Sequence, residues 1–412
     1  MKRIEIAKKA DCCGCAACEA ACPVGCIRME FDEEGFKYPS VDTSLCIDCG
    51  KCSMACPLVS DHDCLGALPV AVAYAATNRD EGIRARSTSG GAFNAIASIV
   101  IEDGGIVVGA RYGEGLKVVH DIATTMEEVS QFYGSKYVQS DLSENEVYRH
   151  VRKACETGAP VLFSGTPCQA QGLHTYLGRD YPGLLTCDFV CHAVPAPLMW
   201  ESYLNDMMLK YGSKPLAAVF RNKTYGYHSG TMKLSFENGK VYYGSGRIDP
   251  MHKAFFADLI SRPSCYECRF RRPERSSDFT IFDCWSYSKL TGCEDDDLGH
   301  THLWAHTDKA MAMLPRLYDY LDLVEVNFDA ALDGDGVMAT HSISRNPDRE
   351  AFLAYSRKHG ITAAVQKFIP VTFLDRVLEK SKGALHHLGV LEALSKVKHS
   401  KTLERQGTAG GA

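Results

Sequence analysis

The chain has 412 residues, 45% of them hydrophobic and 23% charged, which is enough apolar material for a sizeable core and more than one typical domain needs. Its formal charge of −6, without a long lysine or arginine run, argues against a nucleic-acid partner. The start MKRIEIAKK lacks the apolar core of a secretory signal, and the longest apolar run, Ala92–Ile101, is half of the roughly 20 residues that span a membrane. We therefore expect a cytoplasmic protein without a membrane span, in which clustered cysteines indicate metal.

The first 64 residues hold eleven of the 19 cysteines, and eight of these follow the spacing C-x2-C-x2-C-x3-C-P twice. Three thiolates of each group can surround one iron cubane, while the fourth turns away to the other cluster. The predicted ligands are Cys12, Cys15, Cys18 and Cys56 for cluster one, and Cys46, Cys49, Cys52 and Cys22 for cluster two. Zinc sites are the alternative, but they rarely repeat this arrangement with a proline after each last cysteine. Residues 1–64 are therefore predicted to be a ferredoxin domain with two [4Fe–4S] clusters.

Three further cysteines of this head, Cys13, Cys26 and Cys64, do not fit the spacing and are interpreted as buried or incidental thiols. Between the two cysteine groups, residues 27–41 alternate apolar and polar side chains around an Asp/Gly turn. This pattern predicts a β-hairpin that joins the two cluster loops.

After the head, strands and helices alternate. Strands are predicted at residues 70–77, 105–112, 116–124, 160–165 and 184–190, and helices at 90–105, 147–158, 169–178 and 197–212, with Ser143 and Glu146 as a capping box for the second helix. This order predicts an α/β body with a partly parallel sheet. Residues 220–245 alternate about an Asn-Gly turn, which predicts an antiparallel insertion, and the chain is helical from about residue 330. The fold class is therefore α+β and α/β multidomain.

Two segments of the body have the composition of an anion site. The sequence STSGGAF, residues 87–93, places hydroxyls and glycines at a helix start, where free N–H groups suit a phosphate, although a plain glycine-containing cap explains it equally well. The nearby GSKYVQS contains Lys136 and Gln139, which could contact an anionic cofactor, while a solvated lysine is the simpler interpretation.

Four body cysteines lie at the ends of predicted elements. Cys168 and Cys191 follow strands, where α/β folds bind ligands, and Cys265 and Cys268 form a C-x2-C pair. Two cysteines on one turn in a reducing compartment indicate metal, so these four thiols could hold a third [4Fe–4S] cluster, with zinc as the alternative.

Together, STSGGAF, SGTPCQ, FVCH, CYECRF and SSDFTIFDCW, in this order behind a two-cluster head, resemble the coenzyme F420 hydrogenase/dehydrogenase beta-subunit family. The resemblance covers about residue 10 to Leu353. It implies an N-terminal-type domain at 65–160 and a C-terminal-type domain at 161–330. The sequence pattern predicts a helical region at 331–400, and the composition of the end predicts a disordered tail at 401–412. The resemblance also implies FAD, contacted by Ser87, Thr88, Ser89, Gly90, Gly91, Lys136 and Gln139, and a cluster on Cys168, Cys191, Cys265 and Cys268.

Two departures from the family pattern concern the expected flavin ring site. This chain has Ala193 and Ala196 within CHAVPA, where relatives commonly have CHGVPS, and Cys284 where an aromatic residue often precedes Trp285. These differences leave the identity of the hydride partner open.

The leading hypothesis is an oxidoreductase that exchanges electrons between the clusters and a small hydride carrier at FAD, with a redox partner protein or ferredoxin at the other end. His192 is the candidate proton donor, although a structural histidine is the simpler interpretation. The alternatives are a non-catalytic electron-carrier subunit that docks a larger enzyme, and a zinc-stabilised scaffold. The presence or absence of bound flavin separates the first two.

Overall fold

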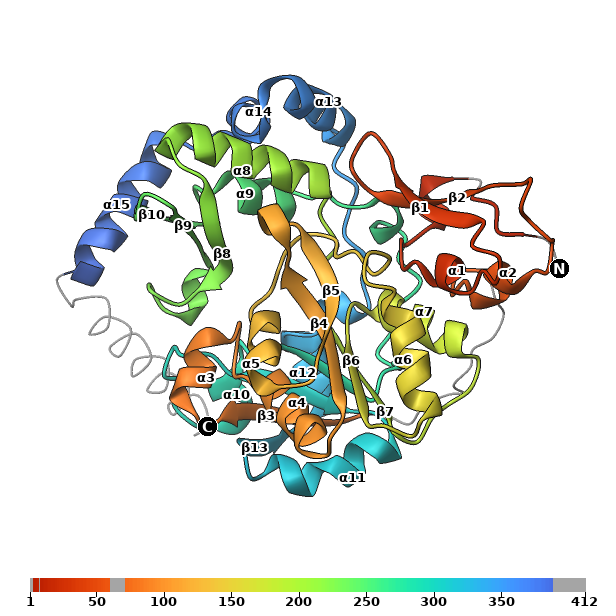
Figure 1. Ribbon diagram of the computed structural model, residues 1–412. Helices are drawn as coiled ribbons and strands as arrows, with labels where there is room; N and C mark the ends of the chain where they lie inside the picture. Colours follow the sequence, from red (N-terminus) through yellow and green to blue (C-terminus); the bar gives the residue numbers. More distant parts are fainter. Residues whose placement is uncertain (1–2, 7, 60–70, 388–412) are drawn as a thin grey trace.

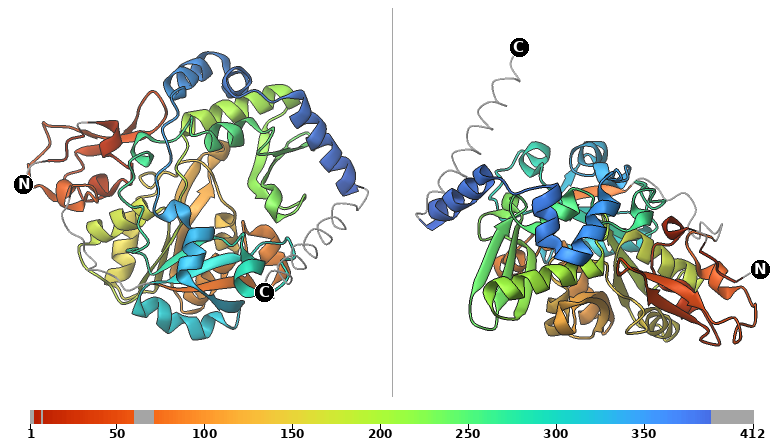
Figure 2. Two further views of the ribbon diagram at one scale, coloured as in Figure 1. Left: turned by 180° about the vertical axis from the view of Figure 1, so that it is seen from behind. Right: turned by 90° about the horizontal axis from the view of Figure 1, so that it is seen from above.

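The computed structural model describes residues 3–6, 8–59 and 71–387. Cys64, Val70 and the predicted tail at 401–412 lie outside the described residues. The head forms one end of the molecule, and the long C-terminal helix α15 (Phe373–His387) lies at the opposite end, as Figures 1 and 2 show. In the described part of the chain, no helix has the length and apolar character needed to cross a membrane.

The head contains a hairpin and short helices that carry the cysteine loops. Strands β1 (Ile27–Phe31) and β2 (Lys37–Val41) pair antiparallel, with Ile27 opposite Val41, so the predicted hairpin is confirmed. The helical elements are η1 (Lys9–Asp11), α1 (Ala17–Ala20) and α2 (Lys51–Ala55). Both α1 and α2 begin after a residue in the left-handed conformation, Ala16 and Gly50, which turns each cysteine loop back into its helix.

The body is built on an eight-stranded sheet with the order β13-β3-β12-β11-β7-β6-β4-β5. The inner strands β4, β6, β7 and β11 run parallel, and the remaining pairs are antiparallel, so the predicted partly parallel sheet is confirmed. Their bounds are β3 (Val72–Asn78), β4 (Ile106–Tyr112), β5 (Val118–Ala123), β6 (Val161–Ser164), β7 (Leu184–Phe189), β11 (Phe279–Asp283), β12 (Thr301–Ala305) and β13 (Leu321–Val326).

Helices cover both faces of this sheet, because strands that run through the centre are apolar on both sides. On one face, α4 (Ala92–Glu102) and α11 (Asp308–Leu317) bury Ile96, Ile99 and Leu314 against the strands. On the other face, α6 (Val147–Glu156) and α7 (Pro167–Leu177) bury Val151 and Leu173. The sheet therefore separates two hydrophobic clusters, and the second continues into the cysteine-rich head.

The predicted capping box of α6 is wrong. The residue before α6 is Glu146, which itself adopts a left-handed conformation with φ of 45°. The hydroxyl of Ser143 donates instead to Asp141 Oδ1 at 2.6 Å, in a local turn that competes with capping. A capping box does form at α7, where the Thr166 hydroxyl accepts from the Gln169 N–H and the Gln169 side chain accepts from the Thr166 N–H.

The antiparallel insertion forms a separate three-stranded sheet of β8 (Pro215–Asn222), β9 (Thr231–Phe236) and β10 (Val241–Ser245). The predicted Asn-Gly hairpin is confirmed, and Gly239 supplies the positive φ of 78° that its turn requires. The surrounding helices are α8 (Pro197–Tyr211), α9 (Pro250–Phe256), α13 (Arg349–His359) and α14 (Ile361–Phe368). The remaining helices are α3 (Glu81–Arg86), α5 (Met126–Val129), α10 (Tyr287–Thr291) and α12 (Phe328–Gly334).

A fully buried arginine fixes the head to the body. Arg262 donates from Nε to the Cys12 carbonyl at 2.8 Å, from Nη2 to the Lys37 carbonyl at 2.9 Å and from Nη1 to Gln139 Oε1 at 2.8 Å. Gln139 in turn donates to the Cys13 carbonyl at 2.9 Å. Because these bonds end on the first cysteine loop, the loop is held in a fixed position against the body.

Candidate redox centres

The structure brings together the four thiols predicted for cluster one. Cys15 and Cys18 flank the start of α1, and Cys56 follows α2. Burial raises the pKa of Cys18 well above its usual value, and the nearby thiols of Cys12 and Cys56 raise it further. A cation among these four thiols would offset the repulsion between their deprotonated forms, and an iron cubane would supply it.

The thiols predicted for cluster two lie toward the surface. Cys49 is exposed and Cys46 half-buried, whereas Cys22 and Cys52 are buried. Cys22 Sγ lies 3.4 Å from Cys26 Sγ, and the pKa of Cys26 is raised to about 12 by burial and by the neighbouring thiols of Cys22 and Cys46. Cys26, which the spacing leaves out, is therefore a direct neighbour of the predicted ligands.

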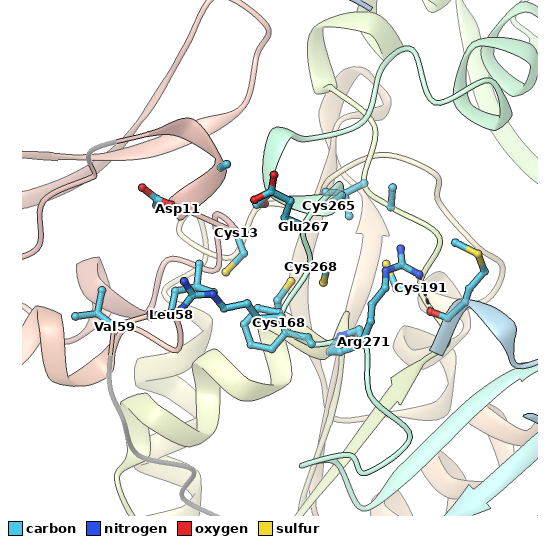
Figure 3. Close-up of a pocket in the computed structure, with 18 of the residues that line it drawn as sticks. Asp11, Cys13, Leu58, Val59, Cys168, Cys191, Cys265, Glu267, Cys268 and Arg271 are labelled. Carbon is cyan, nitrogen blue, oxygen red and sulfur yellow. Dashed lines mark hydrogen bonds between the residues drawn. The ribbon is translucent and has the colours of Figure 1, made fainter. Parts of the chain in front are cut away.

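The four body cysteines meet in a cavity of about 400 Å³ at the junction with the head. Figure 3 shows Cys168, Cys191, Cys265 and Cys268 around this cavity. Cys168 lies in the first turn of α7, Cys191 follows β7, and Cys265 ends the short helix η5 (Pro263–Cys265). Burial raises the pKa of Cys191 well above its usual value, and the other three thiols raise it further, so the four are mutual neighbours. The donor set and its mutual proximity fit an iron–sulfur cluster.

Cys13 enters the same cavity from the head, as Figure 3 shows. A hydrogen bond between Cys13 and Cys168 is the main reason why the pKa of Cys168 is raised. Cys13 also interacts with Cys15, and this contact is the main reason why its own pKa is raised. Cys13 thus lies between a predicted cluster-one ligand and a body cysteine. Its position in the sequence gave no signal of this contact.

Two arginines line the cavity on the body side. Arg275 is buried, and its Nε and Nη1 have no hydrogen-bond partner in the described part of the chain, although Nη1 lies 3.5 Å from Asp188 Oδ2. Arg271 donates to the carbonyls of His192 and Met338. Both positive charges lie beside four thiols, where they would offset the negative charge of a bound cluster. Sequence reasoning did not single out either residue.

The loop Ser87–Gly91 lies apart from this cavity, at the start of α4. Gly91 is the residue before the helix, with φ of 86°, and it has no side chain to cap the first N–H groups of α4. The Thr88 hydroxyl contacts the Ser135 hydroxyl at 3.0 Å, and Ser89 contacts Thr301 at 2.8 Å. The uncapped helix start fits a phosphate group.

Two lysines lie near this loop, Lys223 in contact with Ser89 and Lys136 next to Ser135, which contacts Thr88. Lys136 Nζ donates to the carbonyls of Phe132, Tyr133 and Gly134, and burial lowers its pKa to about 7. Lys223, which sequence reasoning missed, donates to the carbonyls of Arg84, Ser89 and Leu298 at 2.7 Å, and burial together with Arg84 lowers its pKa to about 7. A bound anion near the loop would hold both ammonium groups in the charged form.

A series of contacts between aromatic rings, joined in the middle by Arg221, leads from the cysteine cavity toward the loop Ser87–Gly91. His192, next to Cys191, contacts Phe256 with 5.8 Å between ring centroids, and Phe256 contacts Tyr137 at 6.1 Å. Arg221 donates to the Tyr137 hydroxyl at 3.3 Å and lies 4.8 Å over the Trp285 ring, which stacks on Tyr227 at 4.4 Å. The exposed fraction is 52% for Phe256 and 38% for Trp285, so this run borders open space.

Comparison with known proteins agrees with the order of these parts. Residues 11–59 match the 4Fe-4S dicluster domain. Residues 73–145 match the N-terminal part of the coenzyme F420 hydrogenase/dehydrogenase beta subunit, and residues 158–327 match its C-terminal part. The chain belongs to the coenzyme F420 hydrogenase/dehydrogenase beta-subunit family. In this member of the family, a dicluster head that supports two [4Fe–4S] clusters precedes the beta-subunit body.

Two proteins from Methanosarcina species are similar to this chain. An F420H2 dehydrogenase subunit of Methanosarcina mazei is 29% identical over 282 residues, which cover 65% of this chain and 74% of that protein. A chain in the F420-reducing [NiFe] hydrogenase complex from Methanosarcina barkeri is 17% identical, and the match covers 75% of this chain and 95% of that one with a TM-score of 0.43.

His192 lies at the edge of the cavity region but does not line the cavity, although its neighbours Cys191 and Ala193 do. Its Nε2 lies 2.9 Å from Asp258 Oδ1, and burial lowers its pKa. Gln139 lies at the junction of head and body, where its amide is used by Cys13 and Arg262. The structure therefore brings the four body cysteines together, joins Lys136 to the loop through Ser135, and separates Gln139 from that loop.

Proposed function

We propose that this protein exchanges electrons between its iron–sulfur clusters and a hydride-carrying deazaflavin, coenzyme F420, at a bound FAD, as a subunit of a larger redox complex in the cytoplasm. The observation that carries the proposal is the meeting of Cys13 with the four body cysteines in one cavity at the junction. This meeting gives the dicluster head a path into the body. The name of the Methanosarcina mazei relative, an F420H2 dehydrogenase subunit, supports the choice of coenzyme.

The proposed path begins at cluster two, held by Cys22, Cys46, Cys49 and Cys52. Its exposed Cys49 makes it the point where a redox partner protein or ferredoxin would exchange electrons. Cluster one, on Cys12, Cys15, Cys18 and Cys56, lies between it and the cavity. Each cubane carries one electron at a time, so the path delivers single electrons to the body.

We assign a third [4Fe–4S] cluster to Cys168, Cys191, Cys265 and Cys268. Arg271 and Arg275 place positive charge at this site, which favours the reduced form because reduction adds a negative charge. Replacing Arg275 with leucine should lower the reduction potential of this cluster by tens of millivolts. Redox titration followed by electron paramagnetic resonance measures the shift, and Arg269→Leu, on the same cavity wall but exposed, is the matched control.

We assign FAD to the space beside the loop Ser87–Gly91. The start of α4 would bind a phosphate group, and Lys136 and Lys223 would balance its charge. Bound flavin accepts a hydride as an electron pair and releases single electrons. Trp285 and Arg221 would orient its ring. Gln139 is excluded from the set, because its amide already holds the head loop.

His192 is the proposed proton donor, and Asp258 holds its ring in position. Its place between Cys191 and Phe256 puts it between the proposed cluster and the proposed ring site. Replacing His192 with asparagine should lower turnover about 100-fold while iron and flavin contents stay unchanged. Unchanged turnover would assign His192 a purely structural role.

Metal, sulfide and flavin analysis of anaerobically purified protein tests the proposal. We expect about 12 iron atoms and about one FAD per chain, together with F420H2-dependent reduction of a viologen dye. A content of about eight iron atoms per chain would contradict the assignment of a third cluster. Absence of flavin after reconstitution with FAD would instead support the alternative of a non-catalytic electron-carrier subunit, in which only the clusters of the head transfer electrons.

A further inference from the structure

A second group of side chains that could bind a metal lies outside the cysteine cavity and includes Cys284, the residue before Trp285. Cys284 directly follows β11, His302 lies in β12, and Asp335 follows the last residue of α12. One ligand atom from each residue lies within 4.8 Å of the other two. His302 Nε2 is 3.0 Å from Asp335 Oδ2. The three residues come from separate elements, so the fold itself brings them together.

Strand pairing explains how Cys284 and His302 come to share one face of the sheet. Phe282 lies opposite His302 in the antiparallel ladder, and the Cys284 N–H continues the ladder by donating to the His300 carbonyl at 3.0 Å. Side chains two residues apart on a strand point to the same face, so Cys284 is a diagonal neighbour of His302. The ring of His302 also stacks on Phe282 with 4.6 Å between centroids, which fixes its orientation.

Asp335 reaches this face because two glycines flank it. A Cβ at Gly336 would lie 3.2 Å from Cη2 of Trp304 in β12, and one at Gly334 would lie 3.2 Å from the Ser286 hydroxyl, so the end of α12 packs closely against the sheet. Asp335 then accepts the Ser286 N–H and hydroxyl, both at 2.9 Å. Ser286 follows Cys284 by two residues, so a single turn supplies both the thiol and the donors that orient the carboxylate. Metal-binding carboxylates commonly have such outer hydrogen bonds.

We propose that Cys284, His302 and Asp335 bind one zinc ion. A thiolate, a neutral imidazole and a carboxylate are zinc ligands, and the two negative charges balance the ion in a buried site, where net charge is costly. In a tetrahedral site the nitrogen and oxygen ligands lie about 3.3 Å apart, close to the His302–Asp335 distance. Both Cys284 and His302 are fully buried, and the side chain of Asp335 is 5% exposed. A water molecule would complete the coordination.

The proposed zinc is separate from the iron–sulfur sites and does not depend on the proposed function. It would tie β11, β12 and α12 together immediately before Trp285, and so fix the backbone that carries this ring. Zinc in the cysteine cavity is the arrangement that must be distinguished from it, because four thiols also bind zinc.

Zinc analysis and zinc-edge X-ray absorption on the intact, anaerobically purified protein distinguish the two sites. We expect about one zinc per chain, with one sulfur at about 2.3 Å and nitrogen or oxygen ligands at about 2.0–2.1 Å. Cys284→Ala should lose this zinc, whereas Cys187→Ala, an equally buried thiol in β7, should keep it. Asp335→Asn is a second, milder variant that should bind zinc at least tenfold more weakly.

A four-sulfur zinc shell, zinc that persists in Cys284→Ala, or a wild-type protein without zinc after growth with added zinc would overturn the assignment. The wild-type spectrum needs no variant, so the test holds even if Cys284→Ala fails to fold.

Discussion

The head and the body of this molecule are stabilised by different interiors. About half of the buried side chains of the head are cysteines, and the others are apolar residues such as Ile4, Ile27 and Met29. The body encloses its sheet with aliphatic and aromatic side chains on both faces. A segment of about 60 residues has only a marginal core, so we expect the head to depend on its clusters, whereas the larger core of the body should fold without iron. We therefore expect folding to depend on iron mainly in the head.

Removal of iron should therefore unfold the head and leave the body folded. After anaerobic chelation, we expect hydrogen exchange to accelerate strongly at β1 and β2, while the amides of β4, β6 and β7 remain protected, because these three strands contain no proposed metal ligand. Exchange followed by mass spectrometry measures both regions in one sample. Continued protection of the hairpin in iron-free protein would show that the head is stabilised by its contact with the body alone.

Within the head, two adjacent thiols should differ in their effect on iron content. Cys22→Ser should lower iron by about four atoms per chain, because it removes a proposed cluster-two ligand. Cys26→Ser, 3.4 Å away, should leave iron unchanged. Iron and sulfide assays on anaerobic material measure the difference. Iron loss in Cys26→Ser but not in Cys22→Ser would mean that Cys26, and not Cys22, is the cluster ligand.

The junction between the two regions should depend on Arg262. Arg262→Ala removes donors to one buried and two partly buried acceptors and should cost about 3 kcal/mol of unfolding free energy. The control is Arg269→Ala, which loses one exposed bond to the Leu58 carbonyl and should cost less than about 0.5 kcal/mol. Urea denaturation followed by tryptophan fluorescence compares them. Equal midpoints would mean that the head is held mainly by apolar packing against α7.

The smallest expected effect is a pH dependence that belongs to the body. Burial lowers the pKa of His120 to about 4, so below pH 6.5 the unfolded chain binds a proton that the folded chain does not. Stability should therefore fall as the pH drops from 6.5 toward 4, by at most about 1.4 kcal/mol per pH unit from this residue. His120→Asn should reduce that slope in urea denaturation at pH 7, 6 and 5. An unchanged slope would assign the acid sensitivity to other groups, including the buried His252 and His306.

The sequence predicted the features that depend on the spacing of nearby residues. The 4Fe-4S dicluster domain, the two hairpins and the partly parallel sheet follow from patterns within a few residues. Sequence reasoning failed where a contact joins distant segments. Cys13 has no motif that leads to Cys168, and Arg262 resembles any surface arginine until the fold places it beneath the head. The Ser143 capping box was wrong because Asp141 competes for the same hydroxyl.

The thiols predicted for cluster two include the exposed Cys49, whereas three of the four predicted for cluster one are buried, so the two clusters should differ in their sensitivity to air. Oxygen reaches Cys49 directly, while Cys15 and Cys18 are covered by protein. Oxidative damage should therefore begin at the proposed cluster two, near Cys49, and reach the proposed cluster one later. A briefly aerated sample would lose electron exchange with its redox partner before the iron of the buried clusters is damaged.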